Sequence, residues 1–323
     1  MKLCIGPWST IAIDDNGDVT PCLCGEWHTV GAIGNVIENN FETVFASEKL
    51  NNFKNKILKE DYSSCSVVCP EKGRVPDRDI SVLDNHKAPK HVLLAIDKNC
   101  NLACKSCRNT NIFSNLPNPN AVKILKHLYE YYKNKNITLQ FDGAGDVFAS
   151  KAYKDFLQQD FGSNWKFQII TNGNLLVKNE KIIDRLKDKI TSVDVSLDAG
   201  SDQTYKDVRG GNFDIVKKGI MMCVDKNIRT NISFVVQNKN YKEILDAWTL
   251  GVELKCNSLN LHKIRKWEHM TDEWWNKNCI ENLPKSEKQN LVSQLQQMKS
   301  VQNIVTNSSI PVYMTGDLRN LHL

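Results

Sequence analysis

Three cysteines, Cys100, Cys104 and Cys107, constrain this chain more than any other feature of its sequence. They have the spacing C-x3-C-x2-C and directly follow an apolar run at residues 92–96. That run is short and rich in branched residues, so it predicts a buried β-strand. The loop that leaves the carboxyl end of such a strand is where α/β enzymes place their chemistry. Three thiolates can hold three irons of a 4Fe–4S cube and leave the fourth iron open to an exchangeable ligand. A zinc site is the alternative, and it requires a fourth Cys or His nearby.

The loop at residues 100–107, with the sequence CNLACKSC, resembles the signature loop of radical S-adenosylmethionine (radical SAM) enzymes. In that family the open iron binds the amino and carboxylate groups of the methionine part of SAM. The position before the third cysteine is usually aromatic there, whereas this chain has Ser106. The resemblance implies that Cys100, Cys104 and Cys107 hold a SAM-binding 4Fe–4S cluster.

The first part of the chain contains a second group of cysteines: Cys4, Cys22, Cys24, Cys65 and Cys69. Alternating apolar residues on both sides of a turn at Gly17 predict a β-hairpin, which brings Cys4 and Cys22 together at its open end. Helical periodicity then leads back to Cys65 and Cys69. Two thiolates from the hairpin base and two from a short loop make a four-sulfur site, and the thiolates alone do not choose between iron–sulfur and zinc.

This segment resembles the SPASM and related twitch domains, which carry auxiliary 4Fe–4S clusters. The resemblance rests on Cys4-x12-Gly17-x4-Cys22 and on Cys65-x3-Cys69. It implies one auxiliary 4Fe–4S cluster on Cys4, Cys22, Cys65 and Cys69, with Cys24 as a spare that could replace Cys22. In the family such a domain usually follows the radical SAM core, whereas here it comes first.

Charge and composition narrow the possible partners and the possible location of the protein. The formal net charge of +5 is modest and no Lys/Arg block interleaves with aromatic residues, so we expect no nucleic-acid partner. The sequence has no apolar stretch of membrane-spanning length and its start lacks the apolar core of a signal peptide, which predicts a cytoplasmic protein without a membrane partner. Eleven cysteines in such a chain indicate metal or redox chemistry, and an odd number cannot pair completely.

From residue 91 onward, strand patterns alternate with helix patterns, which predicts a parallel sheet. Successive strand ends resemble, in the family's order, the elements that bind SAM. The resemblance implies cofactor contacts by Gly143, Ala144, Gly145, Asp146, Asn172, Ser196, Asp198 and Arg209. The glycine turn would receive the methionine amino group, Asp198 the ribose, and Arg209 the carboxylate, which suits a guanidinium. The alternatives are a simple turn for the glycines, a helix cap for Asp198 and a surface ion pair for Arg209.

The sequence assigns no catalytic residue. His262 follows the sixth strand, where a substrate could meet the cofactor, and packing is its alternative role. Cys256 and Cys279 could complete the auxiliary site or act on the substrate. These three residues are the candidates for a catalytic role.

The predicted fold class is α/β, a partial (β/α)6 TIM-type barrel preceded by a small α+β cluster domain. The predicted boundaries are a SPASM- or twitch-like domain at residues 1–75, a linker at 76–90, a radical SAM core at 91–270 and a C-terminal helical extension at 271–323.

The resemblance implies reductive cleavage of SAM to a 5′-deoxyadenosyl radical and hydrogen abstraction from a substrate, with a flavodoxin- or ferredoxin-type electron donor. A peptide or protein is the expected substrate, because many SPASM enzymes act on ribosomal peptides. The alternative is a carbohydrate or nucleotide-linked small molecule. An alternative of another class is a non-catalytic iron–sulfur or zinc-binding protein.

Overall fold

The computed structural model describes residues 1–67, 69, 72, 75–83, 88–108, 110–143, 145–267, 269–304 and 312–314. Ala144, residues 84–87 of the predicted linker, and residues 305–311 and 315–323 of the predicted C-terminal extension therefore lie outside the described residues. The chain divides into two compact units, and each is taken by itself below. The first unit comprises Met1–Asn99 with Ser114–Ile169, and the second comprises Cys100–Phe113 with Ile170–Leu323.

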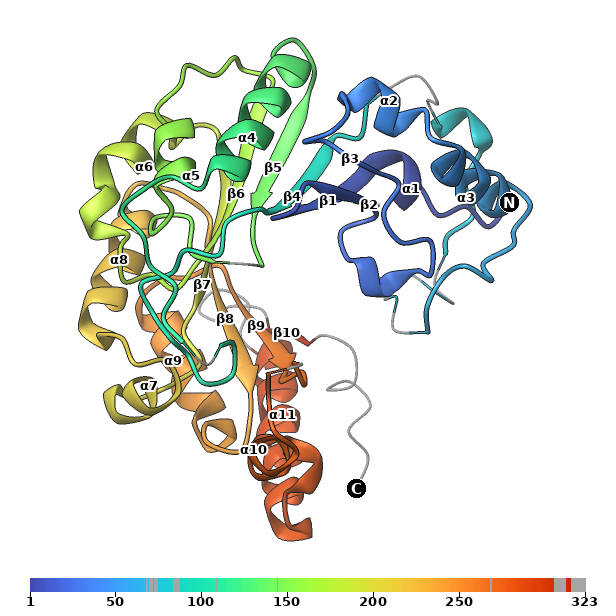
Figure 1. The fold of residues 1–323 in the computed structure, drawn as a ribbon. Helices are drawn as coiled ribbons and strands as arrows, with labels where there is room; N and C mark the ends of the chain where they lie inside the picture. The colour runs from blue at the N-terminus through green and yellow to red at the C-terminus, as the bar shows by residue number, and fades with distance from the viewer. Residues whose placement is uncertain are drawn as a thin grey trace. The chain divides into compact units, whose positions relative to one another are not determined.

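The first unit is built on an open sheet with the strand order β6-β5-β4-β1-β2-β3 (Figure 1). Strands β4, β5 and β6 are parallel, and β1 and β2 form the antiparallel hairpin that the sequence predicts. The strands are β1 (Thr10–Asp14), β2 (Asp18–Pro21), β3 (Gly34–Asn35), β4 (His91–Ala95), β5 (Ile137–Phe141) and β6 (Trp165–Thr171).

Strand β1 pairs in parallel with β4, from Thr10 opposite His91 to Asp14 opposite Ala95. The cysteine-rich first segment and the strands that follow it therefore share one sheet. The domain boundaries predicted from the sequence stay a prediction, because this pairing crosses the predicted linker.

Most helices of the first unit begin at residues whose side chains cap them, with α1 and η1 as the exceptions. The Asn118 side chain accepts hydrogen bonds from the amides of Asn120 and Ala121, and Pro119 opens α4 where an amide hydrogen is not needed. The helices are α1 (Gly6–Ser9), η1 (Gly25–Trp27), α2 (Phe41–Phe45), α3 (Glu48–Leu58), η2 (Ile80–Val82), α4 (Pro119–Tyr132) and α5 (Lys151–Phe156).

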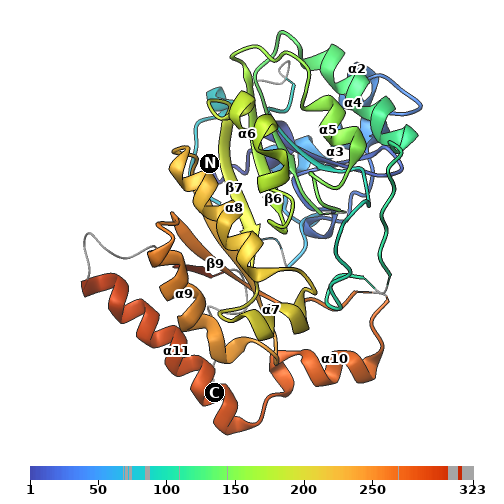
Figure 2. The ribbon, with the colours of Figure 1, turned by 90° about the vertical axis from the view of Figure 1, so that its left-hand side faces the viewer.

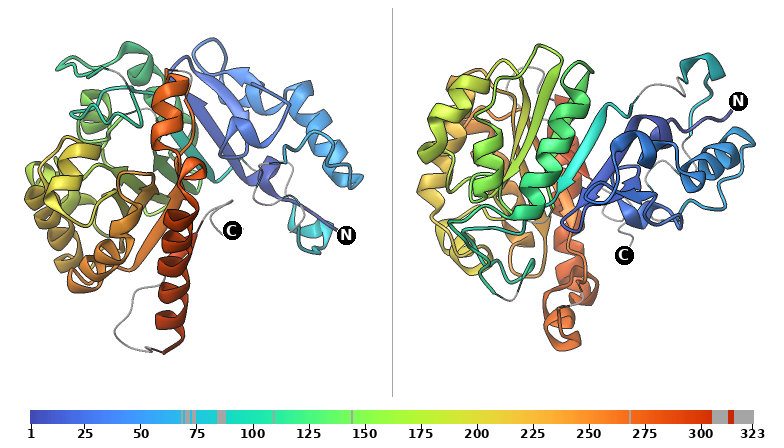
Figure 3. Two further views of the ribbon diagram at one scale, coloured as in Figure 1. Left: turned by 90° about the horizontal axis from the view of Figure 1, so that it is seen from below. Right: turned by 45° about the horizontal axis from the view of Figure 1, so that its top comes forward.

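The second unit has four parallel strands in the order β10-β9-β8-β7. They are β7 (Ile190–Ser196), β8 (Thr230–Val236), β9 (Ser258–Lys263) and β10 (Val312–Met314). Figure 2 shows α8 and α9 alongside this sheet, where α8 packs on β8 and α9 on β9. The long helix α11, orange to red in Figure 3, packs on α9 and β10.

The helices of the second unit are η3 (Val177–Asn179), α6 (Glu180–Leu186), α7 (Asp202–Val208), α8 (Phe213–Asp225), η4 (Tyr241–Glu243), α9 (Ile244–Glu253), α10 (Asp272–Asn278), η5 (Ile280–Asn282) and α11 (Lys285–Ile304). Within each unit, parallel strands follow one another with helices between them, and the sheet is open. The predicted α/β fold class is confirmed. No helix among the described residues is long and apolar enough to cross a membrane.

Candidate cluster and cofactor sites

The loop of Cys100, Cys104 and Cys107 belongs to the second unit. Cys100 and Cys104 are buried, at 8% and 7% exposure, and Cys107 is exposed. The Cys107 amide donates to the Cys104 carbonyl at 2.9 Å, and the Cys100 amide donates to Ile112 at 2.7 Å. Burial raises the pKa of the Cys104 thiol, while the nearby Arg209 charge lowers it by less. Burial therefore favours the neutral thiol of Cys104.

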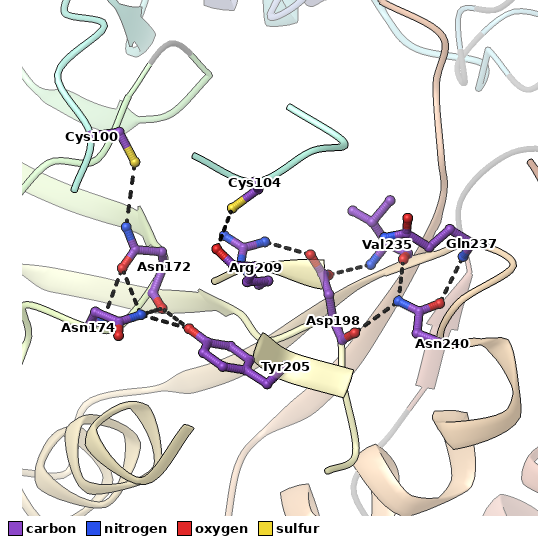
Figure 4. Close-up of polar contacts among 10 residues, drawn as sticks. All are labelled: Cys100, Cys104, Asn172, Asn174, Asp198, Tyr205, Arg209, Val235, Gln237 and Asn240. Carbon is purple, nitrogen blue, oxygen red and sulfur yellow. Dashed lines mark hydrogen bonds and ion pairs between the residues drawn. The ribbon is translucent and has the colours of Figure 1, made fainter. Parts of the chain in front are cut away.

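Asn172 joins this loop to the end of β6. Its Nδ2 donates to Asn101 Oδ1 at 2.9 Å. The same nitrogen lies 3.7 Å from Cys100 Sγ, as Figure 4 shows. Its Oδ1 in turn accepts from the amide of Asn174. The next residue, Gly173, has a φ of +81°, and a side-chain carbon there would lie 2.8 Å from Val216. Only glycine fits, which explains the Thr-Asn-Gly sequence physically.

Asp198 and Arg209 meet just beyond β7. Arg209 Nη1 lies 2.5 Å from Asp198 Oδ2, and both side chains are largely buried. The Arg209 carbonyl accepts from the Cys104 thiol at 3.5 Å. Burial lowers the pKa of Arg209, but the negative charges of Cys104 and Asp198 raise it by more, so the guanidinium stays charged. Ser196, the last residue of β7, is half-buried.

The glycine turn after β5 belongs to the first unit. Gly143 has a φ of +90°, and a side-chain carbon on Gly145 would lie 2.3 Å from the Asn99 carbonyl oxygen. The Asp146 amide donates to the same carbonyl at 2.8 Å, and Asp146 Oδ1 accepts from the Phe148 amide. The glycines therefore allow a close backbone approach. Their contact with SAM stays a prediction, and Ala144 lies outside the described residues.

The second cysteine group gathers within the first unit. The Sγ atoms of Cys4 and Cys22 lie 3.5 and 3.3 Å from the position that a side-chain carbon on Gly6 would occupy. Burial raises the pKa of Cys22, and so do the charges of four neighbouring thiolates, those of Cys4, Cys65, Cys69 and Cys24. Burial and neighbouring thiolates likewise raise the pKa of Cys65 to about 11. Cations of a cluster would remove this repulsion.

An apolar core packs against these cysteines. Leu3, Trp8, Phe53 and Ile57 form a buried cluster against which Cys4, Cys22 and Cys65 pack. His28 lies in an antiparallel bridge with Cys65, and its Nε2 donates to the Pro21 carbonyl at 2.7 Å. Sequence analysis missed His28, because a lone histidine in a loop carries no signal of its own.

Both cysteine groups offer thiolates, which iron–sulfur clusters and zinc both take. Among the described residues, no three His, Cys, Asp or Glu side chains converge to hold one metal ion. In a cube each thiolate binds its own iron, so the ligand sulfurs stand farther apart than those around one zinc. Thiolates are also the donors that such clusters take.

The three candidate catalytic residues, His262, Cys256 and Cys279, do not lie together. His262 lies near the carboxyl end of β9, while the buried Cys256 precedes the amino end of the same strand. Burial and then the Cys223 charge raise the pKa of Cys256 to about 12. Cys279 is buried at the end of α10. Their catalytic roles stay predictions.

A polar network lines one face of the second unit's sheet, and sequence analysis missed it. Asp194, Asn231 and Ser258 are register partners across β7, β8 and β9. Asn231 donates to Asp194 Oδ1 at 2.9 Å and Ser258 donates to Asn231 Oδ1 at 2.9 Å. The next row, Ser196, Ser233 and Asn260, is half-buried. The only sequence signal was polar residues recurring inside apolar strands.

Comparison with known proteins matches both parts of the chain to families. The radical SAM superfamily matches residues 96–249, and the SPASM iron–sulfur cluster-binding domain matches residues 4–70. The two domains imply a 4Fe–4S cluster with SAM and an auxiliary iron–sulfur cluster.

Relatives come from archaea and bacteria. The chain is 28% identical over 196 residues to an uncharacterised protein of Methanocaldococcus jannaschii, covering 56% of this chain and 66% of that one. It is 30% identical over 159 residues to a "probable GTP 3′,8-cyclase" of Methanococcus aeolicus, covering 46% and 51%. It is 26% identical over 161 residues to the subtilosin biosynthesis protein AlbA of Bacillus subtilis, covering 49% and 36%. The matches thus span about a third to two thirds of these relatives.

Among solved structures, SuiB of Streptococcus suis bound to S-adenosylmethionine has a TM-score of 0.53 at 13% identity, covering 85% of this chain and 57% of that one. SuiB bound to its precursor peptide SuiA has a TM-score of 0.51 at 13% identity, covering 83% and 62%. This likeness shows a shared fold.

Proposed function

Because this chain belongs to the radical SAM superfamily and carries an N-terminal SPASM domain, we propose that it cleaves SAM reductively and modifies a peptide or protein. When bound, the cluster and SAM supply the 5′-deoxyadenosyl radical that abstracts hydrogen from the substrate. A flavodoxin- or ferredoxin-type protein is the proposed electron donor.

The observation that carries this proposal is the buried pair Cys100 and Cys104 beside the Arg209–Asp198 ion pair. Cys100, Cys104 and Cys107 hold the SAM cluster, and Asn172 fixes their loop. Arg209 receives the SAM carboxylate, for which a guanidinium is the best side-chain partner. By resemblance, Ser196 and the glycine turn with Asp146 complete the SAM contacts. The protein's part is to orient cofactor and substrate and to exclude water.

Cys4, Cys22, Cys65 and Cys69 hold the auxiliary cluster in this proposal, with Cys24 as the spare. Burial and neighbouring thiolates raise the pKa of Cys22 and of Cys65, which supports this assignment because bound iron would neutralise the thiolates. Reconstituted protein should therefore contain about eight irons per chain, from two cubes. A metal content of four irons and one zinc per chain would contradict the auxiliary iron–sulfur cluster and would still be consistent with the SAM cluster.

A peptide substrate is supported by the names of two similar proteins, AlbA in subtilosin biosynthesis and SuiB bound to the peptide SuiA. A nucleotide-linked small molecule is the second candidate, which the similarity to a "probable GTP 3′,8-cyclase" favours. The half-buried row of Ser196, Ser233 and Asn260 suits hydrogen-bonding groups of either class.

The test uses the anaerobically reconstituted chain with SAM and dithionite. Deuterated peptides encoded beside the gene are compared with deuterated GTP, and deuterium is measured in the 5′-deoxyadenosine that forms. Transfer from the peptide supports the proposal. Transfer from GTP alone favours the second candidate, and absence of 5′-deoxyadenosine under every condition contradicts both.

A further inference from the structure

Asp198 has a partner for each of its oxygen atoms. Oδ1 accepts from the Val235 amide at 2.6 Å, Oδ2 pairs with Arg209 at 2.5 Å, and its carbonyl accepts from Asn240 Nδ2 at 2.9 Å (Figure 4). The residue is only 1% exposed. A carboxylate enclosed in this way has no oxygen left free to accept hydrogen bonds from the two hydroxyls of a ribose.

The backbone explains how Asp198 reaches these partners. Pairing between β7 and β8 ends at Ser196 and Ser233, so the Val235 amide lies beyond the last paired residue of β7. Asp198 adopts a left-handed φ of +56°, which Asp tolerates better than most residues. In this turn the Asp198 carboxylate accepts the hydrogen bond of the Val235 amide, for which β7 offers no paired residue. Contacts within the fold therefore hold this conformation.

Arg209, by contrast, has unused donor capacity. Its side chain is 13% exposed, and its Nε is buried without a hydrogen-bond partner among the described residues. Leaving a buried donor of a charged group unpaired is unfavourable, so this atom marks a place for an acceptor. Its carbonyl contact with Cys104 places Arg209 against the cysteine loop.

We propose that Asp198 is a positioning residue: it holds Arg209 so that the guanidinium Nε donates to the carboxylate of SAM, and it does not contact the ribose. This inference rests on the proposed function, because it requires that the chain bind SAM. Asp198 also balances the charge of Arg209, which would otherwise be buried alone.

The test measures the affinity of the reconstituted full chain for SAM and for decarboxylated SAM, which keeps the ribose and lacks the carboxylate. 5′-Methylthioadenosine, which also keeps the ribose, is the second probe. The variants are Asp198→Asn, Arg209→Gln and their combination. Asn suits the left-handed backbone, and its amide oxygen still accepts from Val235. Its amide nitrogen then faces Arg209, so both the acceptor and the charge that hold the guanidinium are lost. Asp214→Asn, which breaks an exposed ion pair with Lys217, is the control.

We expect Asp198→Asn and Arg209→Gln each to weaken SAM binding about tenfold or more, the range of a hydrogen bond to a charged group. Binding of both carboxylate-free probes should not change, iron content should stay constant, and the double variant should be no worse than Arg209→Gln. Equal losses for SAM and the carboxylate-free probes in Asp198→Asn would overturn the inference in favour of a ribose contact. Unchanged SAM binding, or loss of iron, would also overturn it. Wild-type protein that binds no SAM would overturn the proposed function itself.

Discussion

Cys4 and Cys22 meet at one glycine: their Sγ atoms lie 3.5 and 3.3 Å from the point where a side chain on Gly6 would begin. Cys4 precedes α1 and Cys22 follows β2, so the hairpin closes the gap between them, as its sequence predicts. Glycine at position 6 leaves both sulfurs room to bind a cluster. The packing around Gly6 is thus part of the proposed auxiliary site.

Changing Gly6 to Val should displace both thiols and reduce auxiliary cluster occupancy. We expect the iron content to fall from about eight toward about four per chain, with the SAM cluster retained. The matched control is Gly25→Val, because a side-chain carbon there meets nothing closer than Thr20 at 3.9 Å. Iron analysis of both variants checks this. Full iron content in Gly6→Val would count against Cys4 and Cys22 as joint ligands.

Changing Cys65 to Ala separates the possible roles of the auxiliary cluster. If the cluster accepts an electron from the substrate, SAM cleavage should remain measurable while product formation stops. If the cluster only stabilises the fold of the cysteine-rich first segment, the melting temperature, SAM cleavage and product formation should all fall together. The measurement is 5′-deoxyadenosine and product per folded protein, compared with the melting temperature. A stable variant with full product would refute both roles.

Acid should destabilise the fold partly through His91. Burial lowers the pKa of His91 from 6.5, and its hydrogen bond with Gln140 raises it by less. As the pH falls through about 6.5, the unfolded chain takes up a proton that the folded chain resists, so stability decreases. His91→Gln should therefore flatten the fall of melting temperature between about pH 7 and pH 5. An unchanged slope would contradict this.

Local patterns predicted the strands and the cysteine loop, because a buried strand and its following loop are encoded by neighbouring residues. The strand expected at residues 92–96 is β4, at His91–Ala95. The sequence could not indicate the partners of Asp198, since Val235 and Asn240 lie 37 and 42 residues away. The pairing of β1 with β4 was missed for the same reason. Long-range pairing depends on tertiary packing that periodicity does not encode.

The most direct test of the account compares wild-type protein with Cys104→Ala. Cys104 is 7% exposed and contacts the Arg209 carbonyl, so its loss removes one of the three proposed cluster ligands at the buried side of the loop. The measurement is 5′-deoxyadenosine formed from SAM with dithionite in the anaerobically reconstituted chain, alongside the melting temperature. We predict formation by the wild type and none by a folded Cys104→Ala variant. Formation at the wild-type rate by that variant would contradict the central claim.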